Sequence, residues 1–309
     1  MEVATIQHIE PDQLHDCEAD LFITAIGYES RCTSIARLLE GNNCRKTALW
    51  TQHHNKELAF ESNKNYFSSQ NFDLIKVTSA VPDMDVLLNG ETGDTLKIIV
   101  DCTSMSPQWY FEFFRWFSDL SDRFEHAILR FTYTMANFVE QETNHKVKRI
   151  EDFLKEKNWA VNSKKKKVLI LGLGHEENVG ESIYKLINPD LVYLFYADPP
   201  VERRFVEKIF VNNHGLINDT PIRNLIAYPI RNGQMIYQSM IDIILPLRNE
   251  YEIIVVPQGP KIFAVASMLV QLSYPDISIH YPVFKKEQLL DRESSGDPVI
   301  MDIHFEGEE

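Results

Sequence analysis

Two glycine-containing turns follow apolar segments and precede amphipathic ones. Glycine lets a backbone approach a ligand closely, and a glutamate at such a turn can accept hydrogen bonds from ribose hydroxyls or an exocyclic amine. An acid in a first helical turn also complements the helix dipole, so a capping role stays open. The third glycine of GLGHEENVG comes too late for the dinucleotide-binding pattern GxGxxG. The residues that we single out at these turns are Gly27, Tyr28, Glu29, Gly174, His175 and Glu176.

A second pair of turns carries groups that bind anions. Hydroxyl groups before the aromatic segment WYFEFFRWF can contact phosphate oxygens or cap a helix. Lys261 stands at a predicted helix start, where a cation opposes the dipole unless an anion compensates for it. We therefore expect an anionic ligand here, with a surface role for Lys261 as the alternative. The candidate ligand-binding residues of this pair are Thr103, Ser104, Ser106, Gln258, Gly259 and Lys261.

Three carboxylates at these turns, Glu29, Asp101 and Glu176, are candidates for a general base. Other chemistries have weaker signals. G-x-S-x-G is absent, and Cys102 after an apolar strand is typical of a buried thiol. His53 and His54 lack the spacing of metal ligands. We expect neither a metal nor a cofactor.

The turns belong to a pattern that occurs twice. Residues 21–39 match 168–187, and 96–117 match 251–272; Gly27 precedes Asp101 by 74 residues, and Gly174 precedes Val256 by 82. Apolar strands between helices, without clean alternation, indicate parallel sheets buried on both faces. The pattern predicts an α/β fold of two tandem Rossmann-like halves, with mainly parallel sheets and helices on both faces.

These intervals set the expected domain boundaries. The first half spans 1–135, a polar connecting helix and a linker span 136–167, and the second half spans 168–309 with a C-terminal arm. The stretch VIMDIHF in that arm is predicted to be an edge strand or a partner-facing β-arm. Because strand ends of a parallel sheet share one edge, we expect all four turns around one cleft.

Composition limits the partners. A chain of 309 residues fits two ordinary domains, and a net charge of −14 argues against binding a nucleic-acid backbone. No apolar run reaches the ~20 residues of a membrane span, and the N-terminus lacks a signal-peptide pattern. The cysteines form no CxxC pair, which indicates reduced thiols and a cytoplasmic protein. They are Cys17, Cys32, Cys44 and Cys102.

The turns at Thr103–Ser106 and Gly259–Lys261 resemble those of ligand-binding Rossmann-like domains in prokaryotic defence systems, above all the CRISPR-associated Rossmann fold, called CARF. The resemblance implies that a nucleotide second messenger binds across a two-fold or pseudo-two-fold interface. It covers two short turns and the coarse topology. The chain lacks the threonine-glycine-glycine turn and an appended nuclease domain.

Three classes of function follow. The leading one is binding of a small anionic ligand, most simply a nucleotide, by a sensor or accessory protein of an antiviral defence system. The second is a nucleotide hydrolase or group transferase with a carboxylate base. The third is a protein-interaction module whose acidic surface docks a protein partner.

Overall fold

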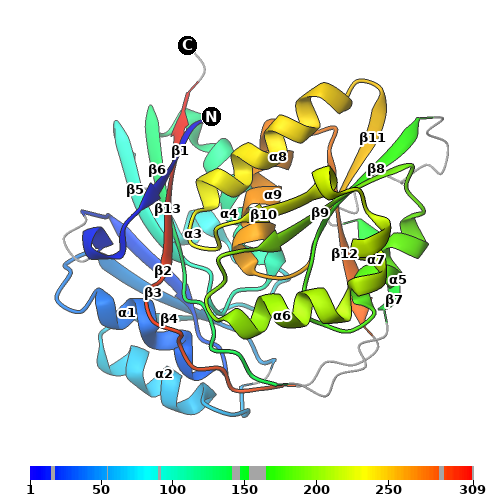
Figure 1. Ribbon diagram of the computed structural model, residues 1–309. Helices are drawn as coiled ribbons and strands as arrows, with labels where there is room; N and C mark the ends of the chain where they lie inside the picture. Colours follow the sequence, from blue (N-terminus) through cyan, green and yellow to red (C-terminus); the bar gives the residue numbers. More distant parts are fainter. Residues whose placement is uncertain are drawn as a thin grey trace. The chain divides into compact units, whose positions relative to one another are not determined.

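The chain forms two α/β units, each built around one mainly parallel sheet (Figure 1). In this computed structural model, unit 1 comprises Met1–Asn137 and Leu289–Glu309, and unit 2 comprises Phe138–Gln288. The predicted α/β class with two Rossmann-like halves is confirmed. The structure describes residues 1–14, 18–53, 55–89, 92–140, 147–152, 165–284 and 289–307.

Five parallel strands form most of the unit 1 sheet. They are β2 (Leu21–Ala25), β3 (Arg45–Trp50), β4 (Asp73–Lys76), β5 (Thr95–Asp101) and β6 (His126–Tyr133). In the sheet, β2 is flanked by β3 and then β4 on one side, and by β5 and then β6 on the other. All five residues of β2 are buried, as expected for a strand that is covered on both faces.

Unit 2 repeats this arrangement. Its parallel strands are β8 (Lys166–Gly172), β9 (Leu191–Ala197), β10 (Leu225–Tyr228), β11 (Tyr251–Pro257) and β12 (Ser278–Phe284). Numbered within each unit, the five parallel strands of both sheets run in the order 3-2-1-4-5. Trp50 ends β3 and Phe195 lies in β9, and these strands hold the same place in the two sheets. The predicted identity of strand order is therefore confirmed.

Helices cover both faces of the unit 1 sheet. They are α1 (Ser34–Leu38), α2 (Phe60–Ser69), α3 (Met84–Leu88) and α4 (Pro107–Ser118), with short 3-10 turns η1 (Pro11–Leu14), η2 (Ser30–Thr33) and η3 (Leu120–Asp122). Phe60 and Phe67 of α2 pack in one core with Phe22 of β2. On the other side, the ring of Phe114 in α4 lies 5.3 Å from that of Phe131 in β6. The aromatic run of α4 is thus core packing.

The unit 2 sheet is covered in the same way. Its helices are α5 (Val179–Ile187), α6 (Arg203–Asn212), α7 (His214–Asp219), α8 (Gly233–Leu247) and α9 (Lys261–Ser273), with the 3-10 turn η4 (Ile222–Asn224). Ile183 of α5 and Ile209 of α6 pack with Leu171 of β8. The ring of Phe263 in α9 contacts that of Phe195 at 5.3 Å.

An antiparallel strand extends the unit 2 sheet where the sequence predicted a connecting helix. Residues Val147–Asp152 form β7, which pairs with β12. The helix prediction is wrong for these residues, because an open sheet edge that needs hydrogen-bond partners outweighs local helix propensity. The predicted linker is also too long, since Lys166 and Lys167 already belong to β8. Residues 141–146 and 153–164 of the expected connection lie outside the described residues.

The C-terminal stretch belongs to unit 1, whereas the sequence placed it in the second half. Residues Val299–Glu306 form β13, and Glu2–Ile9 form β1. The strand β13 pairs antiparallel with both β6 and β1, so it is neither an edge strand nor a free arm (Figure 1, red). Its burial explains this placement, because a strand with six of its eight residues buried is more stable between two neighbours than at an edge.

We expect the buried His280 to make the stability of unit 2 depend on pH. Burial lowers the pKa of His280 below its usual 6.5, although the charge of Asp152, its partner in the β12–β7 register, raises it. The unfolded chain then binds the proton more readily, so this stability is complete above about pH 6.5 and declines as the pH falls. We expect the urea midpoint of wild type to drop between about pH 7 and about pH 5, and to drop less in His280→Asn.

A substitution at an exposed histidine is the control for effects of low pH that do not involve His280. His126 of β6 is exposed, and His126→Asn should show the wild-type pH dependence. Equal pH dependence in the His280→Asn and His126→Asn proteins would contradict the role of His280.

Candidate functional site

The strand order places one topological switch point in each unit. Connections leave in opposite directions from β2 and β5 in unit 1, and from β8 and β11 in unit 2. Ligands of open α/β sheets bind beyond the carboxyl ends of such strand pairs. We call residues 26–31 with 102–106 the unit 1 mouth, and residues 173–178 with 258–261 the unit 2 mouth. That the two mouths share one cleft remains a prediction.

The two loops of the unit 1 mouth touch. A Cβ atom on Gly27 would lie 2.5 Å from Oγ of Ser104, so these residues are brought together as the sequence predicted. The amide N–H of Gly27 is already used, because it donates to Sγ of Cys32 at 3.2 Å. Burial raises the pKa of the Cys32 thiol to about 12, so this sulfur stays protonated at neutral pH.

Asp101 and Thr103 hold the loop after β5. The Asp101 carboxylate is 1% exposed and accepts from Oγ1 of Thr24 at 3.1 Å and from N–H of Thr103 at 3.0 Å. The Thr103 hydroxyl also donates to Asp101, and it accepts from N–H of Thr134 at 2.9 Å. These contacts give both residues a structural role. Asp101 is consequently a poor candidate for a base, which must reach a substrate proton.

Glu29 is neutralised inside the unit 1 mouth. Its Oε2 accepts from Nε of Arg31 at 2.6 Å, and its Oε1 from a terminal nitrogen of Arg292 at 3.0 Å. Arg31 is 5% exposed and also donates to the carbonyl of Thr134 at 2.6 Å. Burial lowers the pKa of Arg31, but Tyr133 and Glu29 outweigh it and hold this pKa above its ordinary value. Arg31 is therefore charged in the folded protein.

The remaining predicted residues of unit 1 are half-buried or exposed. Ser106 is the N-cap residue of α4, yet its hydroxyl makes no capping hydrogen bond and the residue is exposed. Tyr28 is half-buried, and its carbonyl accepts from N–H of Ala59 at 3.0 Å. Of the predicted hydroxyl contacts, Ser104 and Ser106 are thus more accessible than Thr103.

Glycines bring the loops of the unit 2 mouth into contact. Gly259 has a φ of +90°, and a Cβ atom there would lie 2.8 Å from the carbonyl oxygen of Leu173. A Cβ atom on Gly174 would lie 3.5 Å from the amide nitrogen of Gly259 and 2.1 Å from Oε2 of Glu176. Only glycine fits at these positions without a shift of the backbone or of the Glu176 side chain.

Glu176 differs from its counterpart Glu29. Its Oε2 atom is buried and has no hydrogen-bond partner in the structure. A buried acceptor that lacks a donor costs free energy, and such an atom in a mouth is one place to look for a missing ligand. The matching position to Arg31 is Asn178, an uncharged residue at the N-cap of α5. Unit 2 therefore keeps the glutamate but not the arginine beside it.

His175, Gln258 and Lys261 complete the unit 2 mouth. The imidazole ring of His175 packs against the rings of Phe205 and Phe138, at 5.5 and 5.9 Å between centroids. Gln258 is half-buried and directly follows β11. Lys261 is the half-buried first residue of α9, whose N-cap Pro260 supplies no capping side chain.

Asparagines that the sequence analysis missed fix the glycine turn of each unit. Asn63 of α2 donates to the carbonyls of Gly27 and Glu29, both at 2.9 Å. In unit 2, Asn213 donates to the carbonyl of Gly174 at 3.1 Å. Each follows its glycine at a similar interval, so extending the repeat through the second helix would have found them. Arg292 had no such signal, because it contacts Glu29 across 263 residues of sequence.

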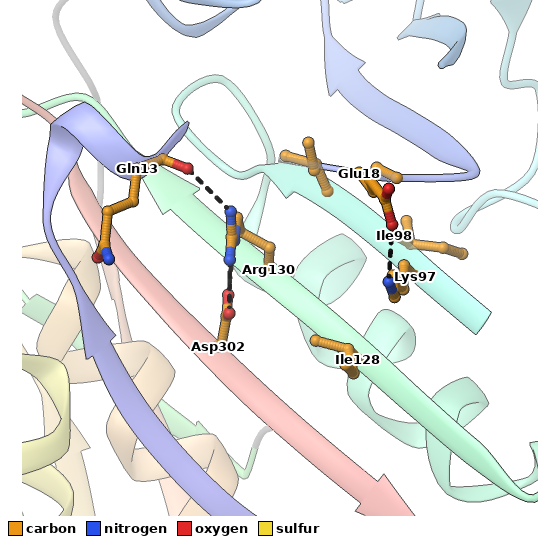
Figure 2. Close-up of a pocket in the computed structure, with 9 residues that line it drawn as sticks. Gln13, Glu18, Lys97, Ile98, Ile128, Arg130 and Asp302 are labelled. Atoms are coloured by element: carbon orange, nitrogen blue, oxygen red, sulfur yellow. Dashed lines mark hydrogen bonds and ion pairs between the residues drawn. The ribbon is translucent and has the colours of Figure 1, made fainter. Parts of the chain in front are cut away.

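A cavity of about 290 Å³ lies at the other end of the unit 1 sheet, near the amino-terminal ends of β2 and β5 (Figure 2). Arg130 and Asp302 form a paired ion contact in it, with two nitrogen–oxygen distances of 2.7 Å. Lys97 lies 3.4 Å from Glu18. The charges of the cavity are thus paired with one another, which leaves no net charge to select a ligand. It is lined by Gln13, Glu18, Ala19, Lys97, Ile98, Ile99, Ile128, Arg130 and Asp302.

A metal site and a membrane span are two further possibilities in the described part of the chain. There, no group of three or more His, Cys, Asp or Glu side chains is placed to hold a metal ion; His54 lies outside it. Within the same residues, no helix has the length and apolar character of a membrane span. No family model and no curated protein matches this chain.

Proposed function

We propose that the unit 2 mouth binds a small anionic ligand, most simply a nucleotide. The proposal depends on one observation: the same switch point holds both a buried acceptor that lacks a donor and a lysine side chain. Oε2 of Glu176 lacks a donor, and Lys261 begins α9. A nucleotide supplies a group for each of them. Its phosphates can bind Lys261 and the helix start, and its hydroxyl and amine groups can donate hydrogen bonds to Glu176.

The sensory role rests on the resemblance to ligand-binding domains of defence systems. Binding without turnover fits a mouth built from glycine turns and held by Asn213. The test begins with the purified protein: it is denatured, and any released nucleotide is identified by mass spectrometry. Release of no nucleotide, together with no binding in the titrations below, would refute the proposal.

A hydrolase or group transferase is the second candidate. Of the three carboxylates that the sequence offered as a base, Glu29 is paired at both oxygens and Asp101 is buried. Glu176 alone among these three keeps an oxygen without a partner. Chromatography of nucleotides incubated with wild type and Glu176→Gln decides between the candidates, since turnover that depends on Glu176 would favour the enzyme.

Lys261→Ala should weaken nucleotide binding about ten- to a hundred-fold, because a charge-assisted hydrogen bond contributes about 1.5–3 kcal/mol. Added salt should weaken binding to wild type more than to Lys261→Ala. Isothermal titration with ATP measures both effects. Lys185→Ala is the control, since Lys185 is exposed and pairs with Glu181 on α5. Equal affinities in all three proteins would leave Lys261 without a binding role.

The same titration shows which side chain contacts the nucleoside of the ligand and which contacts its phosphates. Glu176→Gln should weaken ATP binding but not the binding of inorganic triphosphate, which has no ribose or base. Lys261→Ala should weaken both. If Glu176→Gln weakens triphosphate as much as ATP, the carboxylate does not contact the nucleoside.

A further inference from the structure

Residues 289–296, which precede β13 (Figure 1, orange-red), contact the loop after β2 in the unit 1 mouth. They pair with the chain that leaves β6: N–H of Asn137 donates to the carbonyl of Glu293, and N–H of Ser295 to that of Met135, both at 3.0 Å. An isolated antiparallel bridge joins Ala136 and Ser294. This segment is therefore fixed along its length to the edge of the mouth.

Two charged side chains of this segment reach the loop after β2. The Asp291 carboxylate accepts from N–H of Ser30 at 2.6 Å and from the Ser30 hydroxyl. Arg292 pairs with Glu29 at 3.0 Å, and its carbonyl accepts from N–H of Arg31 at 3.3 Å. The N–H groups of Ser30 and Arg31 and the Glu29 carboxylate are thus satisfied from within the chain.

Asp291 places a carboxylate where an open α/β sheet binds ligands. Its carboxylate lies on hydrogen-bond donors beyond the carboxyl end of β2, at the switch point where an open α/β sheet receives a ligand. The corresponding glutamate of unit 2, Glu176, has an oxygen without a partner. One mouth is therefore filled by its own chain, and the other retains an unsatisfied acceptor.

We propose that residues 289–296 form an intramolecular latch that occupies the unit 1 mouth, with the Asp291 carboxylate in the place of a ligand's anionic group. The latch confines ligand binding to unit 2 while it is closed. That division rests on the proposed function of unit 2, but the latch itself does not. Ser30 and Asp291 are both exposed, and exposed contacts are weak, so the Asp291 end of the latch can release from Ser30 without unfolding of the sheet.

Hydrogen exchange measured by mass spectrometry tests the latch. Asp291→Ala should speed exchange in peptides that cover residues 26–33 by about tenfold, while peptides from β5 and β6 keep wild-type rates. Glu293→Ala is the matched control, because the Glu293 side chain is exposed and its carbonyl makes the backbone contact. Wild-type exchange of residues 26–33 in Asp291→Ala would overturn the proposal.

Inorganic phosphate tests whether Asp291 takes the place of an anion. In Asp291→Ala, phosphate should slow exchange of residues 26–33 towards the wild-type rate, whereas sodium chloride of equal ionic strength should not. Wild type should respond to neither salt. Equal effects of phosphate and chloride on Asp291→Ala would overturn the assignment of Asp291. None of these readouts depends on the unit 2 mouth, so their failure is distinguishable from loss of nucleotide binding in the Lys261→Ala protein.

Discussion

Arg31→Met should lower the free energy of unfolding of unit 1 by about 3 kcal/mol, because it breaks a buried ion pair on one side only. Glu29 is 8% exposed and would keep Arg292 as its one cationic partner. The carbonyl of Thr134 would also lose its donor. The estimate takes the low end of the usual range for a broken buried pair, since Arg292 still offsets part of the charge.

Tryptophan fluorescence in urea is a suitable readout, because three of the four tryptophans of the chain, Trp50, Trp109 and Trp116, belong to unit 1. Arg37→Met is the matched control. Arg37 lies in α1 and is exposed; it donates to Oγ1 of Thr33 at 3.1 Å, and its guanidinium lies 4.2 Å from the centre of the Tyr66 ring, so its loss should cost about 1–2 kcal/mol. A cost for Arg31→Met no larger than that for Arg37→Met would show that the buried pair does not stabilise unit 1.

The strand order could be predicted because its signals are local. Each parallel strand is a short apolar run, and a glycine or small polar turn follows the first and fourth strands of both halves. These runs recur at similar intervals, and a parallel α/β connection allows few topologies. The positions of Gly27 beside Ser104, and of Gly174 beside Gly259, follow from that order.

The antiparallel strands could not be read in the same way. The charged sequence VKRIED of β7 is half-buried or exposed. It forms a strand because the edge of β12 provides backbone hydrogen-bond partners. The sequence of β13 carried a better signal, since five of its eight residues are apolar, and six of the eight are buried in the structure. Its partners β1 and β6 are remote in sequence, so sequence pattern alone does not name them.

Sequence pattern was limited in the same way for the candidate sites. The repeat predicted two equivalent mouths, and the residues at each glutamate do match in position. What distinguishes Glu29 from Glu176 is Arg292, which arrives from the opposite end of the chain, and Arg31, which the second half replaces by Asn178. Local pattern therefore located the mouths, while tertiary contacts decided which mouth has an unsatisfied group.

Gly259→Ala should destabilise unit 2 by about 2–5 kcal/mol. An L-residue at a φ of +90° costs about 1–2 kcal/mol, and overpacking in a tight contact costs about 1–3 kcal/mol more. The contact in question is with the carbonyl oxygen of Leu173, 2.8 Å from the new Cβ atom, and a backbone atom cannot turn aside as a side chain can. The loop after β8 must move instead, so nucleotide affinity should fall in the same variant.

Gly41→Ala isolates the conformational part of this cost. Gly41 has a φ of +88°, almost that of Gly259, but nothing lies within 4 Å of a Cβ atom built there. Its replacement should cost only the about 1–2 kcal/mol of the backbone conformation and should leave nucleotide affinity unchanged. Urea unfolding followed by circular dichroism gives both costs, and titration with ATP gives both affinities. If the two alanine variants lose equal stability, the contact between the loops after β8 and β11 does not hold the unit 2 mouth closed around its glycines. A larger loss in Gly259→Ala, accompanied by weaker ATP binding, is the result that ties the geometry of this mouth to the ligand.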